Sequence, residues 1–448
     1  MKPIIRNEMA IKFGVVILLF LMLQIPLMMI DSLIAERNLR QQEVKQEIAR
    51  SSSGPQQFIG PLLVARYQET VTLEGQSHQV SRQAIVLPER YQFQANLNSF
   101  EKYRGIYTAR LYRADSQVQG SLNLSTLSDL PKDSIESLAL VVAVSDSRGI
   151  GAIDTLTLDG QAYEVEPGTE LRQWPQGFHA PLPLSLLQQQ TPLAFELALQ
   201  LQGMGQLEVM PVGNATEVTL SSPWPHPSFI GDYLPVSSDI DHSGFRAHWV
   251  TNNFSTNIRQ LFTLCLQSSS NCGQLNARQM GVSLIDPVDH YLKSHRTVNY
   301  SLLVITLIFA SFFLLELFQA RPIHPIQYGF VGLALALFYL LLISLSEHIG
   351  FNPAYLISAL ASTTLLGVYV SGMLPGRRQG GVFSACLLAL YAMLFGLLQA
   401  ESYALLMGSL LCFAILSLVM VITRHVNWYQ RQSTSANASA KLTPDIQD

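Results

Sequence analysis

The stretch FGVVILLFLMLQIPLMMI, residues 13–30, decides how this chain is organised. It contains 18 residues without a charged side chain, and a membrane-spanning helix needs about 20 predominantly apolar residues. Lys2, Arg6 and Lys12 precede it. A cleavable signal peptide also starts with basic residues, but its apolar core is usually about 7–15 residues long and ends at an Ala-x-Ala-like site, which does not follow here. We therefore predict an uncleaved signal anchor, with residues 1–12 in the cytoplasm.

A second apolar region occupies the last third of the chain. Residues 300–423 contain only six charged side chains, and these divide the region into segments that are long enough to span a bilayer. We predict five further spans that short loops join into a compact bundle within 299–423. Their approximate ranges are 300–318, 328–345, 353–374, 382–399 and 403–423.

The distribution of basic residues predicts on which side of the membrane each segment lies. Nine Lys and Arg residues lie outside the segment 31–298, and six spans would place all nine on the same side. Loops with an excess of Lys and Arg face the cytoplasm. We therefore predict a multi-pass protein of the bacterial inner membrane, with both termini cytoplasmic, including the tail 424–448, and with residues 31–298 in the periplasm.

The overall composition agrees with a membrane protein. Hydrophobic residues make up 48% of the chain and charged residues 13%, with a net charge of −4, whereas charged residues are about 25% of a typical soluble domain. These values exclude a disordered chain, a basic nucleic-acid-binding protein and an ordinary cytosolic enzyme. Membrane lipid is an expected partner, and nucleic acid is not.

The segment between the first two spans is predicted to hold a stalk and a domain. It contains 26 Asp and Glu against 19 Lys and Arg, so it is mildly acidic. Residues 31–50 have a helix-forming composition with few helix breakers, and SSSGP at 51–55 supplies the residues that end a helix. We expect a helical stalk over 31–50, followed by a β-rich domain over 51–298.

Alternation of apolar and polar residues predicts strands in this domain. Residues 92–98, 163–166 and 193–202 each alternate, and a period of two is typical of a strand with one face in water. The dipeptide DG at 159–160 is a hairpin signal, and GMG at 203–205 is a second candidate. We predict an α+β membrane protein with six transmembrane helices and a large antiparallel, sandwich-like periplasmic domain inserted between helices 1 and 2.

Two cysteines lie in the predicted periplasmic segment. Cys265 and Cys272 are separated by six residues, and the periplasm is an oxidising compartment in which disulfides form. We predict a local disulfide that closes a small loop; the alternative is two unpaired thiols. Cys386 and Cys412 fall in predicted spans and are expected to act as small apolar residues.

No sequence motif predicts catalysis. HExxH, CxxC and HxH patterns do not occur, although metal sites commonly use them. The Gly-x-Ser-x-Gly motif of hydrolases and the phosphate-binding loop are also missing from the sequence. A catalytic triad is defined by geometry rather than by order, so a periplasmic enzyme stays open as a third possibility. We predict that the protein is not an enzyme and uses no cofactor or metal.

Three polar residues near one membrane segment form a candidate intramembrane polar site. Glu316 is the one acidic residue clearly close to a predicted span, and Arg321 and His324 follow within eight positions. Ionisable residues within a membrane often mark ion or substrate pathways. One interpretation is an interfacial ion pair that sets the end of the helix, and the other is a proton or signal relay.

The segment SPWPHPSFIGDYLP, residues 222–235, has the composition of a binding loop. It contains four prolines together with Trp, Phe and Tyr. Rigid segments lose less entropy on binding, and aromatic residues dominate the energetics of interfaces. The alternative is a rigid connection that caps the sheet core. The candidate partner-binding residues are Trp224, Pro225, His226, Pro227, Phe229, Asp232 and Tyr233.

Three shorter motifs predict tight turns. They are SGPQ at 53–56, RGIG at 148–151 and EPGT at 166–169, which combine the residues that turns favour. Arg148 could bind an anion, but one Arg beside glycines is too little to predict such a site.

Several blocks of the sequence resemble one known family. They are SSGPQ at 52–56, GIY at 105–107, RGIG at 148–151, WPHPSFIGDYLP at 224–235 and HPIQYGFVGLALALFYLLLISLSEHIGF at 324–351. In content, order and spacing they are similar to the CreD family, inner-membrane proteins that are grouped with cell-envelope integrity. The resemblance covers roughly residues 1–430 and does not include the tail 431–448. It implies a link to the Cre two-component regulatory system, to stress responses and to colicin tolerance, and it implies no catalytic residue.

We therefore predict a non-enzymatic envelope-integrity or stress-response protein whose periplasmic domain acts on an envelope partner. The expected protein partner is another inner-membrane or periplasmic protein, such as a sensor kinase or an envelope component, because the short cytoplasmic loops leave no room for an output domain. The alternative function is a transporter or permease-like export factor, which a file of polar residues across the bundle would support. The third possibility, a periplasmic enzyme, would need His and carboxylates converging near residues 224–232.

Overall fold

A computed structural model describes most of the chain, which divides into two compact units. The described residues are 8–73, 76–128, 130–131, 134–189, 191–268, 271–286, 290–319, 323–373, 377–399 and 404–424; the side chains of 313–319 are among a few within these ranges that are not described. One unit comprises residues 36–289, and the other comprises residues 1–35 together with 290–448.

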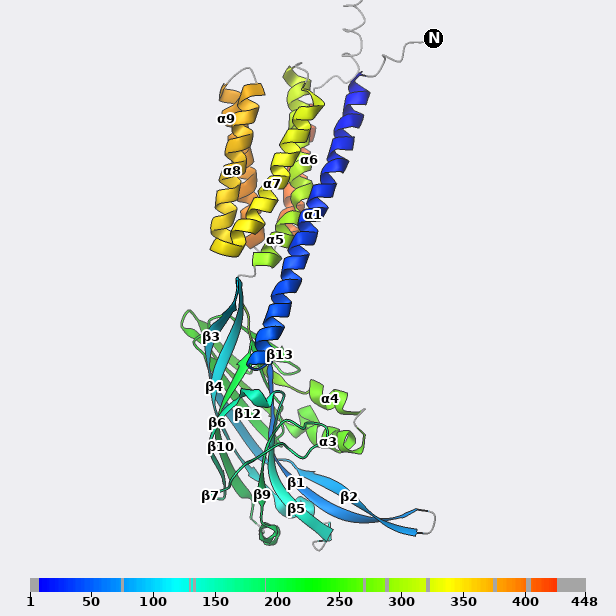
Figure 1. Cartoon of the computed structure of the whole chain (residues 1–448), viewed down its shortest axis with the longest axis vertical. Helices are drawn as coiled ribbons and strands as arrows, with labels where there is room; N and C mark the ends of the chain where they lie inside the picture. Colours follow the sequence, from blue (N-terminus) through cyan, green and yellow to red (C-terminus); the bar gives the residue numbers. More distant parts are fainter. Residues whose placement is uncertain are drawn as a thin grey trace, which may run out of the picture. The chain divides into compact units, whose positions relative to one another are not determined.

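The first helix, α1, runs without a break from Glu8 to Ser51. The apolar stretch 13–30 and the predicted stalk 31–50 therefore belong to one helix of 44 residues, drawn in blue in Figure 1. Pro26 lies inside it, as spanning helices tolerate. The helix ends before Gly54 and Pro55, because neither residue favours helix continuation.

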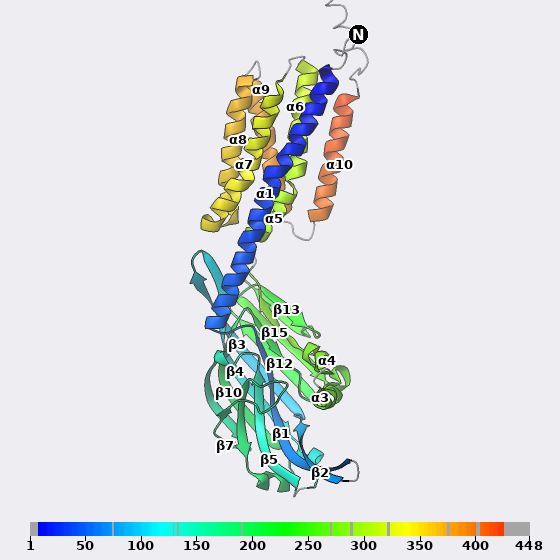
Figure 2. The ribbon, with the colours of Figure 1, turned by 45° about the vertical axis from the view of Figure 1, so that its right-hand side comes forward.

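The unit of residues 36–289 is built from two eight-stranded sheets among its described residues (Figures 1 and 2). The first sheet has the spatial order β13 (Pro227–Gly231), β16 (Met280–Leu284), β11 (Gln206–Val209), β1 (Gln56–Leu73), β5 (Ile135–Val144), β9 (Gly177–Leu182) and β8 (Glu166–Pro167), and β2 (Gln76–Val86) also pairs with β1. The second sheet has the order β14 (Ser237–Asp241), β15 (Gly244–Asn252), β12 (Ala215–Ser222), β3 (Arg90–Arg104), β4 (Tyr107–Leu122), β10 (Leu193–Met204), β6 (Ile150–Leu158) and β7 (Gln161–Ala162). The predicted large β-rich domain is confirmed.

The apolar faces of the two sheets meet in one core. Along β10 the buried positions alternate with more exposed ones from Leu193 onward, as the period of two in the sequence indicates. Across the core, the rings of Phe58 on β1 and Phe93 on β3 have centroids 5.0 Å apart. The opposite face of β3 carries Gln92 and Gln94, which are exposed. The second sheet therefore has one face in the core and one face in water. In the first sheet, consecutive residues such as Leu62 and Leu63 on β1 are both buried, so both of its faces are covered there.

Two features of the sheets differ from the prediction. The pairs β1–β11 and β12–β3 are parallel, so the prediction of purely antiparallel sheets is wrong at these pairs. Parallel neighbours need a long crossover connection. Local alternation does not show which distant strand will pair with a given strand. The predicted turn at 203–205 is not a hairpin, because β10 belongs to the second sheet and β11 to the first. Gly205, with φ of +72°, lies where the chain crosses between sheets.

The hairpin signal at 159–160 joins β6 to β7, which pair through two residues of each strand. Asp159 and Gly160 both have positive φ values, +51° and +77°, as a two-residue hairpin turn requires. Residues 163–165, which the alternation assigned to a strand, lie between β7 and β8 and outside both. A pattern of only four residues is too short to separate a strand from a connecting segment.

Short helices complete this unit. They are η1 (Leu124–Leu127), η3 (Ser147–Gly149), η4 (Leu184–Gln188), α2 (Asn253–Thr256), α3 (Ile258–Gln267) and α4 (Cys272–Ala277). Cys265 on α3 and Cys272 on α4 form a disulfide, with their Cα atoms 4.5 Å apart. Both cysteines are buried, so the disulfide ties α3 and α4 together against the sandwich core.

The other unit is helical. After the described part of α1 it contains α5 (His290–Asn299), α6 (Ser301–Gln319), α7 (Pro325–Ile349), α8 (Phe351–Met373), α9 (Arg377–Gln399) and α10 (Ala404–Thr423). Within the described residues, four helices are long and apolar enough to cross a membrane: Gly14–Ser51, Pro325–Ile349, Phe351–Met373 and Arg378–Gln399. Helices α6 and α10 lie where two further spans are expected, and the total of six spans stays a prediction.

Candidate functional site

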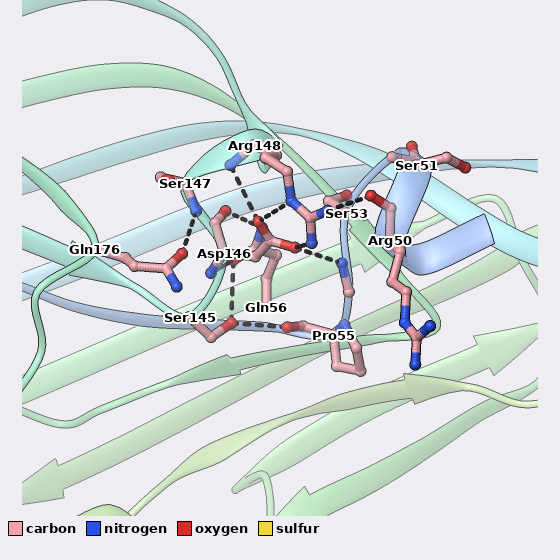
Figure 3. A network of polar contacts seen from close by, with 12 residues as sticks. Arg50, Ser51, Ser53, Pro55, Gln56, Ser145, Asp146, Ser147, Arg148 and Gln176 are labelled. Carbon is pink, nitrogen blue, oxygen red and sulfur yellow. Dashed lines mark hydrogen bonds and ion pairs between the residues drawn. The ribbon is translucent and has the colours of Figure 1, made fainter. Parts of the chain in front are cut away.

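The end of α1 is held by a polar network that combines two of the predicted turn motifs. SGPQ follows α1 after one residue, Ser52, and RGIG contributes to η3 and the start of β6. Gly54 of SGPQ bonds Asp146, which lies two residues before RGIG and 92 positions after Gly54. Figure 3 shows these segments side by side. We call this set the junction network, and its members are Arg50, Ser53, Gly54, Gln56, Asp146, Arg148 and Gln202.

Asp146 is the centre of the junction network. Its Oδ2 accepts hydrogen bonds from the backbone N–H of Gly54 at 3.0 Å and from Nη2 of Arg148 at 2.7 Å. Its Oδ1 accepts from Nε of Arg148 at 2.9 Å and from the backbone N–H of Arg148 at 3.1 Å. The hydrogen-bonded Arg148 guanidinium lowers the pKa of the Asp146 carboxyl below its usual value. The carboxylate is therefore charged near neutral pH and bonded through both oxygens.

Arg148 connects this carboxylate to the last turn of α1. Its Nη1 donates a hydrogen bond to the backbone carbonyl of Arg50. The last carbonyls of an α-helix have no partner within the helix, and a cation at this end interacts favourably with the helix dipole. Arg148 thus supplies both a hydrogen-bond donor and a positive charge to the end of α1. The contacts with Asp146 and Arg50 occupy the guanidinium of Arg148. They argue against the anion-binding site that the sequence left open.

Gln56 and Ser53 extend the network to the second sheet. Nε2 of Gln56 donates to the backbone carbonyl of Asp146 at 2.8 Å and to that of Gln202 at 3.1 Å. Oγ of Ser53 also donates to the carbonyl of Gln202, at 2.9 Å. Gln56 begins β1 of the first sheet, whereas Gln202 lies on β10 of the second. The end of α1 is therefore fixed to both sheets of the sandwich.

Gly149 makes the close approach of these segments possible. A Cβ atom at this position would overlap Nε2 of Gln56 and the backbone carbonyl of Gln202. The φ of Gly149 is not among the positive values, so the glycine is needed for space rather than for an unusual backbone conformation. The turn motif RGIG is thus also a packing motif.

The chemistry of the junction network suits a mechanical connection. It holds one carboxylate, whose charge one guanidinium balances, and its other bonds are made by amides and hydroxyls. Within the part of the chain that the structure describes, no group of three or more His, Cys, Asp and Glu side chains could hold a metal ion. We find in the network neither an activated nucleophile nor a base that is free to accept a proton.

The second half of the Pro-rich segment lies at the edge of the first sheet and packs onto its own domain. The ring of Phe229, on β13, contacts the rings of Phe245 and Trp249, with centroids 6.2 Å and 5.6 Å away. Nε1 of Trp249 donates to the backbone carbonyl of Tyr233 at 3.0 Å. Phe229 and Tyr233 therefore have structural contacts that the sequence pattern did not distinguish from binding contacts.

The first half of the segment is also anchored. Cζ of Arg110 lies 3.5 Å from the centroid of the Trp224 ring, and Nε1 of Trp224 donates to the backbone carbonyl of Ile285 at 2.9 Å. The ring of His226 lies 5.5 Å from that of Trp224. Pro225 and Pro227 flank His226 in the chain. This half of the candidate loop is thus held against β4, which carries Arg110.

Two highly exposed apolar side chains follow the segment's aromatic residues. Asp232 forms an ion pair with Arg278, with a distance of 3.1 Å between Oδ2 and Nη1. Leu234 and Val236, by contrast, are 75% and 71% exposed. Neither residue is among the candidate partner-binding residues, although apolar side chains next to a proline-stiffened strand were a usable signal.

The candidate intramembrane polar site is described only in part. Arg321 lies outside the described residues, and so does the side chain of Glu316. Nδ1 of His324 accepts a hydrogen bond from the backbone N–H of Ile326 at 3.3 Å, and the Gln327 side chain accepts from the backbone N–H of His324 at 3.1 Å. This reciprocal arrangement is a capping box, so His324 forms the N-terminus of α7.

Comparisons with known proteins agree over nearly the whole chain. The family model described as inner membrane protein CreD matches residues 8–429. The inner membrane protein CreD of Escherichia coli strain K12 is 36% identical over 444 residues, which cover 98% of this chain and 97% of that protein.

Similarity to solved structures is much weaker. An M1 zinc metallopeptidase from Deinococcus radiodurans gives a TM-score of 0.21 with 11% identity, over 37% of this chain and 38% of that chain. Native leukotriene A4 hydrolase from Saccharomyces cerevisiae gives a TM-score of 0.20 with 10% identity, over 37% of this chain and 26% of that chain. Scores at this level carry no argument about activity.

The matched range includes both turn motifs of the junction network and the four helices of the described residues that could cross a membrane. The apolar helices and the near-complete match with an inner membrane protein together indicate a membrane-embedded protein. The chain belongs to the CreD family of inner membrane proteins.

Proposed function

We propose that this protein is a non-enzymatic envelope-integrity factor of the bacterial inner membrane that senses or supports an envelope partner through its β-rich unit. Residues 31–298 are periplasmic in this proposal, and both termini are cytoplasmic. The nine Lys and Arg residues outside 31–298 support this orientation, because cytoplasmic loops carry an excess of basic residues. The partner is an envelope component or another inner-membrane protein.

The observation that carries the proposal is the junction network. It joins the final turn of α1 to β1 and β10, one strand from each sheet, and α1 also contains the apolar stretch 13–30. Hydrogen bonds to charged groups contribute about 1.5–3 kcal/mol each, so separating α1 from the sandwich would break several strong contacts together. A force or rotation applied to the sandwich is therefore passed to α1 instead of being absorbed by a flexible linker.

A complementation experiment tests this role. Cells that lack the protein are supplied with the wild-type chain or with Arg148→Ala, and survival in deoxycholate measures envelope integrity. Arg66→Ala is the matched control, because Arg66 forms an ion pair with Glu170 that lies away from α1 and is exposed, where ion pairs contribute little. We expect Arg66→Ala to restore survival and Arg148→Ala to restore much less, at equal amounts of protein in the membrane.

Full restoration by Arg148→Ala would overturn the coupling role. The orientation is tested separately with single cysteines in a chain whose Cys386 and Cys412 are replaced by Ala. A membrane-impermeant maleimide should label Ser81→Cys in intact cells, and it should label Ser435→Cys only after the cells are opened. Labelling in the reverse order would place the β-rich unit in the cytoplasm and overturn the proposal.

A transporter or export factor is the second candidate, which a group of buried hydroxyls in the helical unit favours. Among the described atoms, Tyr339 OH, Ser358 Oγ and Thr363 Oγ1 are buried and have no hydrogen-bond partner, and polar groups that face a transport pathway would likewise lack partners in the protein. If the hydroxyls are only structural, Ser358→Ala is neutral or stabilising, because it removes an unpaired buried group. If they line a pathway, Ser358→Ala abolishes deoxycholate survival, whereas the exposed control Ser409→Ala does not.

A further inference from the structure

The outward face of the second sheet carries a regular array of polar side chains. The strand register places Gln94 beside Gln117 on β4 and beside Thr219 on β12. Two residues along the strands, it places Asn96 beside Asp115 and Ser221 in the same way. Two adjacent rows of amide, hydroxyl and carboxylate groups therefore run across the strands on the face that points away from the core.

This polar face is hollowed. One hollow of about 310 Å³ and another of about 410 Å³ share Asn96, Ser221 and Arg246 in their walls. The first reaches Asp154 on β6, and the second reaches Asp239 on β14. The two hollows therefore form one groove from β6 to β14. The groove crosses seven neighbouring strands, a path of about 29 Å at the usual spacing of about 4.8 Å between strands.

A small residue lies in the floor of the first hollow. Ala198 on β10 pairs with Gln117 on β4 and with Thr155 on β6, and it lines the first hollow. Its neighbours on the same face of β10 are Glu196 and Gln200, whose side chains are longer. The short side chain of Ala198 lowers the floor of the groove between longer polar groups on either side.

The backbone of the groove floor excludes a peptide that binds by strand addition. The strands β10, β4, β3, β12 and β15 each have a hydrogen-bonded neighbour on both sides, whereas strand addition needs the free N–H and C=O groups of a sheet edge. A ligand in this groove therefore meets side chains. Amides donate and accept, hydroxyls donate and accept, and carboxylates accept hydrogen bonds.

The charge of the groove selects among ligands with this hydrogen-bonding capacity. Asp115, Asp154, Asp239 and Asp241 line it, against Arg246 as the cation among the residues in its walls. This excess of negative charge disfavours nucleic acids, anionic lipid head groups and other polyanions. A chain of uncharged sugars fits the hydrogen-bonding groups and is not repelled by this charge, because its hydroxyl groups donate and accept along its whole length without adding charge.

We propose that this groove binds an uncharged glycan chain several sugar units long. The inference names the class of envelope partner in the proposed function, and it rests on that proposal for the compartment in which the glycan is met. Among the described residues, Phe245 is the one aromatic residue in the walls of the two hollows, so recognition depends on hydrogen bonds across several sugars rather than on ring stacking. Longer chains therefore bind more tightly than short ones.

Binding is tested with the full-length protein in detergent micelles by isothermal titration calorimetry. The probes are chitohexaose, cellohexaose and maltohexaose, with the disaccharide of each series for comparison. We expect at least one hexasaccharide to bind in the submillimolar range and its disaccharide to bind at least tenfold more weakly. No binding by any of the three hexasaccharides at millimolar concentration overturns the inference.

Two matched variants on one strand locate the site. Ala198→Gln fills the groove floor and should weaken hexasaccharide binding at least tenfold. Ala194→Gln makes the same change on the same face of β10, four residues away and outside both hollows, and should bind as the wild type does. Asn96→Leu, which keeps the side-chain size but removes the amide, should weaken binding without filling the groove. Thermal unfolding confirms that each variant is folded.

The outcomes separate this inference from the proposed function. Unchanged binding by both Ala198→Gln and Asn96→Leu would place any glycan elsewhere and overturn the inference. Tighter binding of a polygalacturonate hexamer, of anionic phospholipid vesicles or of a peptide than of every neutral hexasaccharide would do the same. Titration with purified protein does not depend on Arg148 or on membrane orientation, so a failed complementation or labelling experiment with intact glycan binding overturns the proposed function alone.

Discussion

For the junction network and the Pro-rich segment 222–235, the role that the structure shows differs from the role that the sequence suggests. In the sequence, the Pro-rich segment has the composition of a binding loop, whereas SGPQ and RGIG look like isolated turns. In the structure, Trp224 and Phe229 contact their own domain. The two turns, by contrast, meet and hold the end of α1. Composition therefore reports how stiff a segment is, but contacts between distant segments decide what it does.

The two regions also differ in the kind of contact that stabilises them. The junction network is centred on charge-assisted hydrogen bonds of Asp146, whose side chain is 12% exposed. The Pro-rich segment depends on aromatic packing and on one cation–π contact at a partly exposed edge. We expect substitutions in the junction network to have larger effects on stability and on pH dependence than substitutions in the Pro-rich segment.

The largest expected effect is that of Gly149→Val. The added side chain would overlap Gln56 and Gln202, and overpacking of this kind typically lowers the free energy of unfolding by about 1–3 kcal/mol, occasionally more; we expect the upper end because backbone is among the overlapped atoms. Urea unfolding, followed by tryptophan fluorescence, measures it. Gly273→Ala is the control, because a Cβ there meets nothing within 4 Å. Equal unfolding midpoints for both variants would contradict the packing role.

Asp146→Asn should have the next largest effect, and the effect should depend on pH. Loss of charge-assisted bonds to Arg148 and Gly54 should lower the free energy of unfolding by about 2 kcal/mol at pH 7. The pKa of Asp146 is lowered in the folded state, so its contribution is complete above the unfolded pKa of about 3.9 and is lost as the pH falls through the folded pKa. The difference between wild type and variant should therefore be constant from pH 7 to about pH 5 and should shrink below about pH 4.

Unfolding experiments at several pH values measure this difference. An exposed carboxylate serves as the control: Asp241→Asn removes a group that bonds Ser243 within its own turn. A difference for Asp146→Asn that grows below pH 4 would contradict the predicted sign.

Trp224→Ala should have an intermediate effect. It removes the contact with Arg110, whose side chain is 11% exposed, and a partly desolvated cation–π contact contributes about 1–2 kcal/mol. Trp224→Phe keeps an aromatic face and should lose less than half as much. Both are measured by urea unfolding. If the two variants were equally destabilised, the hydrogen bond from Trp224 to Ile285 rather than the ring face would be the main contact.

The smallest effect on stability is expected for Leu234→Ser, within about 0.5 kcal/mol, because substitutions of exposed side chains rarely cost more. Leu234 is nevertheless the position at which the Pro-rich segment could still bind a partner. A photo-crosslinking residue at Leu234 should capture a specific envelope protein in intact cells, whereas one at Phe229, which faces Phe245 and Trp249, should not. Capture at Phe229 alone would show that this edge opens in the cell.

Much of the fold could be predicted because local patterns report local structure. Residues 193–202 alternate, and they form β10; residues 13–30 are apolar and lie within α1. The parallel pairing of β1 with β11 joins residues about 150 positions apart, and no local pattern identifies such a partner. At Gly205 the local sequence does not distinguish two structures, because the same glycine turn suits a hairpin and a crossing between sheets.

The candidate site could be predicted only in fragments. The turns at 53–56 and 148–151 were visible from their Gly, Pro and Ser residues. That Gly149 is a packing position depends on Gln56 and Gln202, which come from two other strands. The sequence shows the same glycine whether that residue forms a turn or allows close packing. Only the segments that contact it distinguish the two roles.

The arrangement of β1 has a consequence for how the protein is made. On a ribosome, α1 and β1 emerge first, and β2 follows directly and pairs with residues 63–73 of β1. The strands that pair with the rest of β1 emerge later: β5 begins at Ile135 and β11 at Gln206. Asp146, which completes the contact with Gly54, also comes 92 residues after it. The apolar helix is therefore available for membrane insertion while one edge of β1 is still unpaired, and unpaired strand edges aggregate readily. The first sheet can therefore close around β1 only after β11 has been made, later than in a sandwich assembled from neighbouring hairpins alone.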